Sequence, residues 1–231
     1  MAASADWRIY PSRAALAEAL AGDVAKVLAA SIDSRGKAVL AVSGGSTPGL
    51  LFTALSKHRL DWANVVVTLV DERFVPPTSE RSNERLVRER LLVNEARLAR
   101  FVPLYSNADT AEQAAAQAKA GLDLFGPLDV SILGMGTDGH TASFFPDANN
   151  LGALLDPAAA SGVEAVHAPS AGEPRLTQTL ARLLNARFLA LHIEGEEKRT
   201  VLEEAVKPGS RLPIGAVFQQ STRALPIYWA A

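Results

Sequence analysis

The sequence has no cysteine among its 231 residues, which excludes disulfides, thiolate zinc sites and a cysteine nucleophile. A chain without cysteine is typical of the cytosol, so we expect a cytoplasmic protein. It also has no apolar run near the ~20 residues of a membrane-spanning helix, and its first residues lack the charged-then-apolar profile of a secretory signal. We therefore expect no membrane partner.

An excess of basic residues is also missing. The formal net charge is −2, from 23 Lys and Arg against 25 Asp and Glu. This balance argues against a nucleic-acid binder that works through a general basic surface. With 48% hydrophobic and 21% charged residues, the composition is ordinary for a soluble globular protein.

Short apolar runs alternate with segments of helical periodicity along the chain. The predicted strands are 38–42, 65–70, 101–104, 130–133, 163–167, 188–193 and 225–229. The predicted helices are 12–34, 49–55, 83–92, 111 to 121 or 126, 174–184, 194–206 and 213–219, with caps at Ser12, at Ser82 or Asn83, and at Thr110. This alternation predicts an α/β fold with a mainly parallel, Rossmann-like sheet and helices on both faces.

The stretch 133–146, Leu-Gly-Met-Gly-Thr-Asp-Gly-His-Thr-Ala-Ser-Phe-Phe-Pro, follows a predicted core strand. Asp138 and His140 flank Gly139 there, at the end of a strand where open α/β sheets bind ligands. Imidazole titrates near neutral pH, so His140 is the candidate general base and Asp138 the group that orients it. The alternative is a plain glycine turn in which His140 caps a helix.

A second turn joins strand 38–42 to helix 49–55. Its small residues expose backbone N–H groups at a helix N-terminus, which is a ready anion site; they are Ser43, Gly44, Gly45, Ser46 and Thr47. The missing Gly-Lys-Ser/Thr ending excludes a nucleotide P-loop, and serine catalysis would need a Gly-x-Ser-x-Gly elbow. A plain strand-to-helix turn is the alternative.

Charged residues gather at the same predicted edge of the sheet. Asp71-Glu72-Arg73 directly follows strand 65–70, and Arg175 and Lys198 begin predicted helices. A cation at a helix N-terminus is unfavourable by up to ~1 kcal/mol, so an anion bound between the two cations and the helix ends would explain why both residues stand there. The alternative is that both side chains point into solvent. Right-handed crossovers put the strand ends together. The set predicts a site for a phosphorylated metabolite.

Three motifs in this order closely resemble the 6-phosphogluconolactonase family: Ser-Gly-Gly-Ser-Thr-Pro (43–48), Asp-Glu-Arg-Phe-Val-Pro (71–76) and the stretch 134–146. Segments 174–177 and 194–198 are similar to later motifs of that family, so the match spans almost the whole chain and implies a single domain over residues 1–231. The resemblance implies a three-layer α/β/α fold shared with glucosamine-6-phosphate deaminase. It implies hydrolysis of 6-phospho-D-glucono-1,5-lactone to 6-phosphogluconate in the oxidative pentose phosphate pathway, with no metal or organic cofactor.

By the same resemblance, His140 and Asp138 are catalytic. The implied substrate-binding residues are Ser43, Gly44, Gly45, Ser46, Thr47, Asp71, Arg73, Asn83, Gly139, Arg175 and Lys198. The expected partner is a small sugar-phosphate lactone, with no nucleic acid, and the protein is expected to be a monomer or a small homo-oligomer. The other histidines, His58, His167 and His192, are interpreted as structural.

Two other functions fit parts of the same pattern. The first three motifs also resemble those of the glucosamine-6-phosphate isomerases and deaminases, in which Asp71 would move the C2 proton of the substrate. However, the deaminases carry a glutamate before the proline that ends the third motif, where this chain has Phe145. A non-catalytic sugar-phosphate sensor is the second alternative, but it would not need His140, and the sequence shows no helix-turn-helix extension.

Overall fold

The computed structural model describes residues 5–231. Its strands are β1 (Ala5–Ile9), β2 (Ala38–Val42), β3 (Val65–Leu69), β4 (Asp71–Arg73), β5 (Arg100–Phe101), β6 (Val130–Leu133), β7 (Val163–Val166), β8 (Arg175–Gln178), β9 (Phe188–Glu194) and β10 (Leu225–Ala230). Its α-helices are α1 (Arg13–Arg35), α2 (Gly49–Leu55), α3 (Asn83–Arg90), α4 (Ala111–Asp123), α5 (Leu151–Leu154), α6 (Leu180–Leu184), α7 (Glu196–Ala205) and α8 (Pro213–Gln220).

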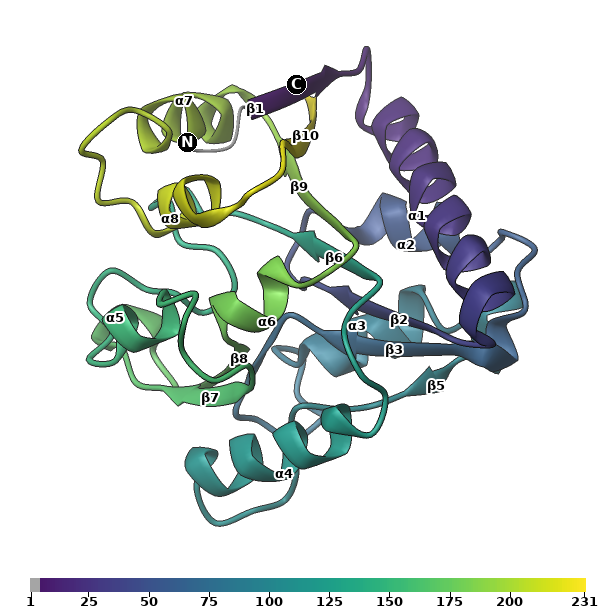
Figure 1. Cartoon of the computed structure of the whole chain (residues 1–231), viewed down its shortest axis with the longest axis horizontal. Helices are drawn as coiled ribbons and strands as arrows, with labels where there is room; N and C mark the ends of the chain where they lie inside the picture. Colours follow the sequence, from purple (N-terminus) through teal and green to yellow (C-terminus); the bar gives the residue numbers. More distant parts are fainter. Residues whose placement is uncertain (1–4) are drawn as a thin grey trace.

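A seven-stranded sheet in the order β1-β10-β9-β6-β2-β3-β5 forms the centre of the molecule, and all its strand pairs are parallel (Figure 1). Every residue of β2, β3 and β6 is buried, which requires cover on both faces of the sheet. Helix α1 packs against β2, β6, β9 and β10 and also against α2. The predicted α/β fold, a parallel sheet flanked by helices, is confirmed.

The strand order reverses at β2. Strands β3 and β5 lie on one side of β2, whereas β6, β9, β10 and β1 lie on the other. The loops that leave β2 and β6 therefore diverge, and an open α/β sheet has its ligand crevice at this switch point. Both glycine-rich motifs, residues 43–48 and 134–140, are those two loops.

A second sheet of three antiparallel strands, in the order β4-β8-β7, was not predicted. The prediction that a helix begins at Pro174 is wrong, because residues 175–178 form the middle strand of this sheet and α6 begins at Leu180. Pairing with β4 on one side and β7 on the other supplies the backbone hydrogen bonds of β8. Leu176 thus belongs to a buried strand, although its spacing to Leu180 and Leu183 is helical.

The helix caps follow the sequence closely. The Oγ atoms of Ser12 and Ser82 and the Oγ1 of Thr110 each accept a backbone N–H three residues ahead, at the starts of α1, α3 and α4. Strand β5 covers residues 100–101 and not 101–104, the ends of β3, β7, β9 and β10 differ from their predictions by one residue, and β1 and α5 were not predicted. None of the helices within residues 5–231 is long and apolar enough to cross a membrane.

Candidate active site

A cavity of about 240 Å³ lies at the switch point. The loops after β2 and β6 form much of its wall, and further side chains come from β4, β8, β9 and the starts of α2, α3 and α7. The lining residues include 42–48, 132–136, 140–142, Leu51, Phe52, Asp71, Arg73, Asn83, Arg175, His192 and Lys198. Segments more than 150 residues apart in sequence, at Thr47 and Lys198, touch here through a 3.2 Å hydrogen bond. Eleven of the thirteen predicted site residues therefore share one cavity.

His140, which lines this cavity, forms a hydrogen-bonded pair with Asp138. The Asp138 Oδ1 atom lies 2.5 Å from His140 Nδ1 and also accepts the backbone N–H of His140 at 3.2 Å. Partial burial would raise the pKa of Asp138, but the hydrogen bond and charge of His140 outweigh it and hold that pKa below its usual value. An ionised Asp138 accepts Nδ1–H, so the tautomer that it favours carries a lone pair on Nε2.

The loop around this pair is tightly held. Gly136 donates its backbone N–H to the His140 carbonyl at 2.9 Å, and the ring of His140 stacks on Phe145 with 4.6 Å between centroids. Gly139 has φ +77°, and a Cβ there would lie 3.0 Å from Leu212. Ala142 has a positive φ of 50°, which is strained for alanine and recurs at functional loops.

Loop 43–47 faces the cavity with free donors. Within residues 5–231, the backbone N–H groups of residues 44–47 have no acceptor, so they are available to an anion. Gly44 leaves room for Asn83, since a Cβ at Gly44 would lie 1.9 Å from the Asn83 Oδ1 atom. Helix α2, which follows, has only seven residues, so the argument for an anion site rests on the loop amides and not on a long helix dipole.

Three cations face the same space. Burial lowers the pKa of both Arg175 and Lys198. Nearby carboxylates oppose this shift: Asp71 and Glu173 act on Arg175, and Glu194 and Glu197 act on Lys198. Lys198 lies in the first turn of α7, as expected, but Arg175 lies on β8 and not at a helix start, so the helix-terminus argument holds for Lys198 alone. Desolvated cations of this kind bind an anion more strongly than exposed ones.

Two buried carboxylates hold the β4 side of the cavity. Asp71 accepts a hydrogen bond from Ser143 Oγ at 2.7 Å, while its carbonyl accepts from Asn83 Nδ2 at 2.9 Å. Glu72 points away from the cavity and accepts four hydrogen bonds at 2.7–3.0 Å, from the N–H groups of Arg73, Asn83 and Glu84 and from Ser82 Oγ. Glu72 thereby joins β4 to the start of α3.

The family model described as "Glucosamine-6-phosphate isomerases/6-phosphogluconolactonase" matches residues 11–227. The chain belongs to this family. Among similar members, the 6-phosphogluconolactonase of Mesorhizobium japonicum is 58% identical over 229 residues, which cover 99% of this chain and 96% of that protein. The 6-phosphogluconolactonase of Rhizobium meliloti is 54% identical, covering 98% of this chain and 99% of its own.

Solved structures of the glucosamine-6-phosphate isomerase/6-phosphogluconolactonase family share the fold. The crystal structure of a 6-phosphogluconolactonase from Shewanella baltica superposes with a TM-score of 0.94 at 40% identity and covers 100% of both chains. A monomeric glucosamine-6-phosphate deaminase superposes with a TM-score of 0.74 at 18% identity, which is a likeness of fold alone.

Some site residues of this family member were missed or stand differently from their prediction. Asp138 and Gly139 lie beside the cavity and do not line it, whereas His192, interpreted as structural, does. The Nε2 atom of His192 is buried 3.3 Å from Glu194 Oε1 without forming a hydrogen bond. Ser143 was missed although it lies in the third motif. Within residues 5–231, no three His, Asp or Glu side chains are grouped as metal ligands.

Replacing Glu72 with alanine is expected to destabilise the protein by about 2–5 kcal/mol, because four donors, three of them in buried hydrogen bonds, lose their acceptor. For a chain of this size that corresponds to a fall in Tm of about 4–20 °C, measured by thermal unfolding. Glu89→Ala, on the exposed face of α3, is the control. A Glu72→Ala Tm within about 2 °C of the wild type would show that Glu72 does not hold β4 to α3.

Proposed function

We propose that this protein hydrolyses 6-phospho-D-glucono-1,5-lactone to 6-phosphogluconate, as a cytoplasmic enzyme of the oxidative pentose phosphate pathway. The observation that carries the proposal is the His140–Asp138 pair at a cavity whose wall also holds Arg73, Arg175 and Lys198. A general base beside a cluster of cations suits an ester that carries a phosphate. The name of the relatives that are 58% and 54% identical supports the same reaction.

His140 acts as the general base in this proposal. Its Nε2 takes a proton from a water molecule while the water oxygen attacks C1 of the lactone. The tetrahedral intermediate then collapses, the bond between C1 and the ring oxygen breaks, and the imidazolium returns the proton to that oxygen. Asp138 holds the tautomer and stabilises the imidazolium, as a carboxylate does for a catalytic histidine. The product carboxylic acid ionises and releases one proton to solution.

The phosphate of the substrate is assigned to the cations and the loop amides. Lys198 Nζ lies 3.2 Å from Thr47 Oγ1, so the ammonium and the 44–47 amides converge on one region of the cavity. Arg73 and Arg175 approach from the second sheet. Among the described lining residues, three carry a positive charge and Asp71 a negative one, which leaves a net positive cavity for an anionic substrate.

The experiment that tests the proposal follows proton release from freshly made 6-phosphogluconolactone, with and without the protein. The lactone also opens unaided, so the difference between the two rates is the measured quantity. A rate that does not depend on the concentration of the protein would contradict the proposed function.

No ammonia or fructose 6-phosphate is expected from glucosamine 6-phosphate. Opening that amino sugar and moving its C2 proton requires acid–base groups at two places, and Phe145, stacked on His140, cannot donate or accept a proton. The Phe145→Glu variant is also expected to release no ammonia from glucosamine 6-phosphate, because the new carboxylate would lack supporting hydrogen bonds. A coupled ammonia assay measures both proteins. Ammonia from the wild type at a rate comparable with lactone hydrolysis would favour the deaminase alternative.

A further inference from the structure

Two of the cavity cations lie directly opposite each other on neighbouring strands. Arg73 of β4 and Arg175 of β8 are partners in the antiparallel register, and both line the cavity. Like charges in this position repel and destabilise the pair of strands. Arg175 is also almost fully buried, at 8% exposure. The site therefore needs other groups to hold the two guanidinium groups in place before an anion arrives.

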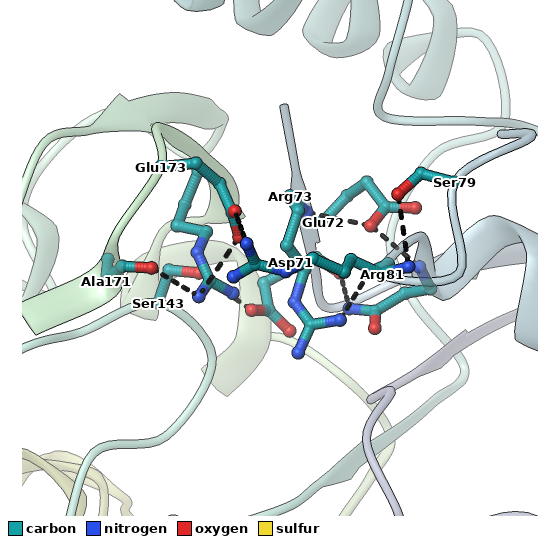
Figure 2. Close-up of polar contacts among 10 residues, drawn as sticks. Asp71, Glu72, Arg73, Ser79, Arg81, Ser143, Ala171 and Glu173 are labelled. Atoms are coloured by element: carbon teal, nitrogen blue, oxygen red, sulfur yellow. Dashed lines mark hydrogen bonds and ion pairs between the residues drawn. The ribbon is translucent and has the colours of Figure 1, made fainter. Parts of the chain in front are cut away.

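An ion pair outside the cavity supplies this restraint. Glu173 Oε2 lies 2.5 Å from Arg81 Nη1, and Glu173 Oε1 lies 3.6 Å from Arg175 Nη2. The backbone carbonyl of Arg81 in turn accepts a hydrogen bond from Arg73 Nη1. Figure 2 shows Glu173 on the Ala171 side of this group and Arg81 on the Ser79 side, with Arg73 and Asp71 between them. The Ala171 carbonyl also accepts a hydrogen bond from Arg175 at 3.0 Å. The contacts run from Arg73 through Arg81 and Glu173 to Arg175.

The burial of Glu173 separates this arrangement from an ordinary surface ion pair. Its side chain is 15% exposed, and its Oε1 is buried without a hydrogen bond, so within residues 5–231 its charge is balanced by Arg81 and Arg175 alone. An exposed pair contributes little, but a buried carboxylate needs its cations in place. Neither Glu173 nor Arg81 lines the cavity, so a ligand bound there would not touch either side chain.

We propose that the Arg81–Glu173 ion pair is a positioning device that orients Arg73 and Arg175 for the phosphate of the substrate. The assignment rests on the proposed sugar-phosphate substrate. Without Arg81, the Glu173 carboxylate pairs more closely with Arg175 and draws it from the cavity. Without the Glu173 charge, three arginines repel one another. In both cases the anion must reorder the site as it binds, which costs affinity.

The variant Glu173→Gln distinguishes a positioning role of Glu173 from a simple effect of its negative charge. If Glu173 acted only through its negative charge near the cavity, Glu173→Gln would make the site more positive and strengthen anion binding. A positioning role predicts the opposite result. Glu173→Gln and Arg81→Met are each expected to raise KM for the phosphorylated lactone by about threefold to tenfold, with kcat changed by less than about twofold. Hydrolysis of unphosphorylated gluconolactone is expected to stay within about twofold of the wild type.

Three further variants test the role of the ion pair and control for the loss of an exposed charge. Arg81→Met with Glu173→Gln is expected to be no worse than the poorer single variant, because both changes remove one interaction. Arg81→Lys, which keeps a charge within reach of Glu173, is expected to recover most of the affinity. Glu89→Gln, which breaks the exposed Arg85–Glu89 pair on α3, is the matched control and is expected to bind as the wild type does.

Binding of 6-phosphogluconate and of gluconate, measured by calorimetry on the same proteins, separates this inference from the proposed function. A wild type that binds 6-phosphogluconate without hydrolysing the lactone contradicts the function, while the variants still test the ion pair by binding. Glu173→Gln that binds as tightly as the wild type or tighter overturns the inference, as does an equal loss for phosphorylated and unphosphorylated ligands. If Glu173→Gln fails to fold, the two Arg81 variants decide by the same criteria.

Discussion

His140→Ala is expected to lower kcat for 6-phosphogluconolactone by about 10²–10⁴-fold, because a positioned general base contributes that much. The substitution removes the imidazole and leaves the loop amides, Arg175 and Lys198 unchanged, so affinity for 6-phosphogluconate should be retained. Rates come from proton release corrected for spontaneous opening, and affinity comes from calorimetry. The two measurements together separate loss of chemistry from loss of the fold.

His167 provides the control for this experiment. Its Nε2 lies 2.8 Å from Glu112 Oε1, so it forms a second histidine–carboxylate pair, but it is exposed and lies outside the cavity. His167→Ala should keep the rate of the wild type. A His140→Ala protein that hydrolyses within about threefold of the wild type would remove His140 from the role of base.

Lys198→Ala is expected to raise KM for the phosphorylated lactone by about 30-fold or more, since losing one partner of a desolvated charge pair costs about 2–5 kcal/mol. Lys198 is half-buried, and burial lowers its pKa against the opposing charges of Glu194 and Glu197. Unphosphorylated gluconolactone does not use the ammonium, so its hydrolysis should change little. Initial rates over a range of each lactone give the two KM values.

Lys26→Ala removes an exposed lysine of α1 that pairs with Asp23, and it should leave both KM values unchanged. If Lys198→Ala impairs both lactones equally, the lysine stabilises the loop through Thr47 and does not bind phosphate. A loss confined to the phosphorylated lactone would support the assignment.

The sequence predicted the cavity where its residues follow core strands. Residues 43–47 come directly after β2, and His140 lies in the loop after β6; the apolar runs of both buried strands are visible without a structure. Parallel strands carry their carboxyl ends to one edge, so these loops were expected on the same edge of the sheet, where they border the crevice at the switch point. Lys198 was placed correctly for the same reason, since it begins the helix after β9.

The second sheet could not be predicted in this way. Strand β4 has three residues and β8 has four, and both are stabilised by pairing between segments about 100 residues apart. Local periodicity carries no information on such pairing, and Leu176 happened to continue the helical spacing of α6. The register of Arg73 against Arg175 and the contact of Arg81 with Glu173 follow from that pairing, so neither was visible in the sequence.

The cavity is lined by residues that lie far apart in the sequence, and this has a consequence for folding. Its wall includes Ser43, Asp71, His140, Arg175 and Lys198, which span more than 150 residues of the sequence. Contacts of such high sequence separation close large loops and form late relative to helices and turns. A partly folded chain can thus contain β2, β3 and their helices and still have no base opposite a phosphate site. Recovery of activity after dilution from denaturant therefore reports the last long-range contacts of refolding, whereas recovery of helical signal reports the first.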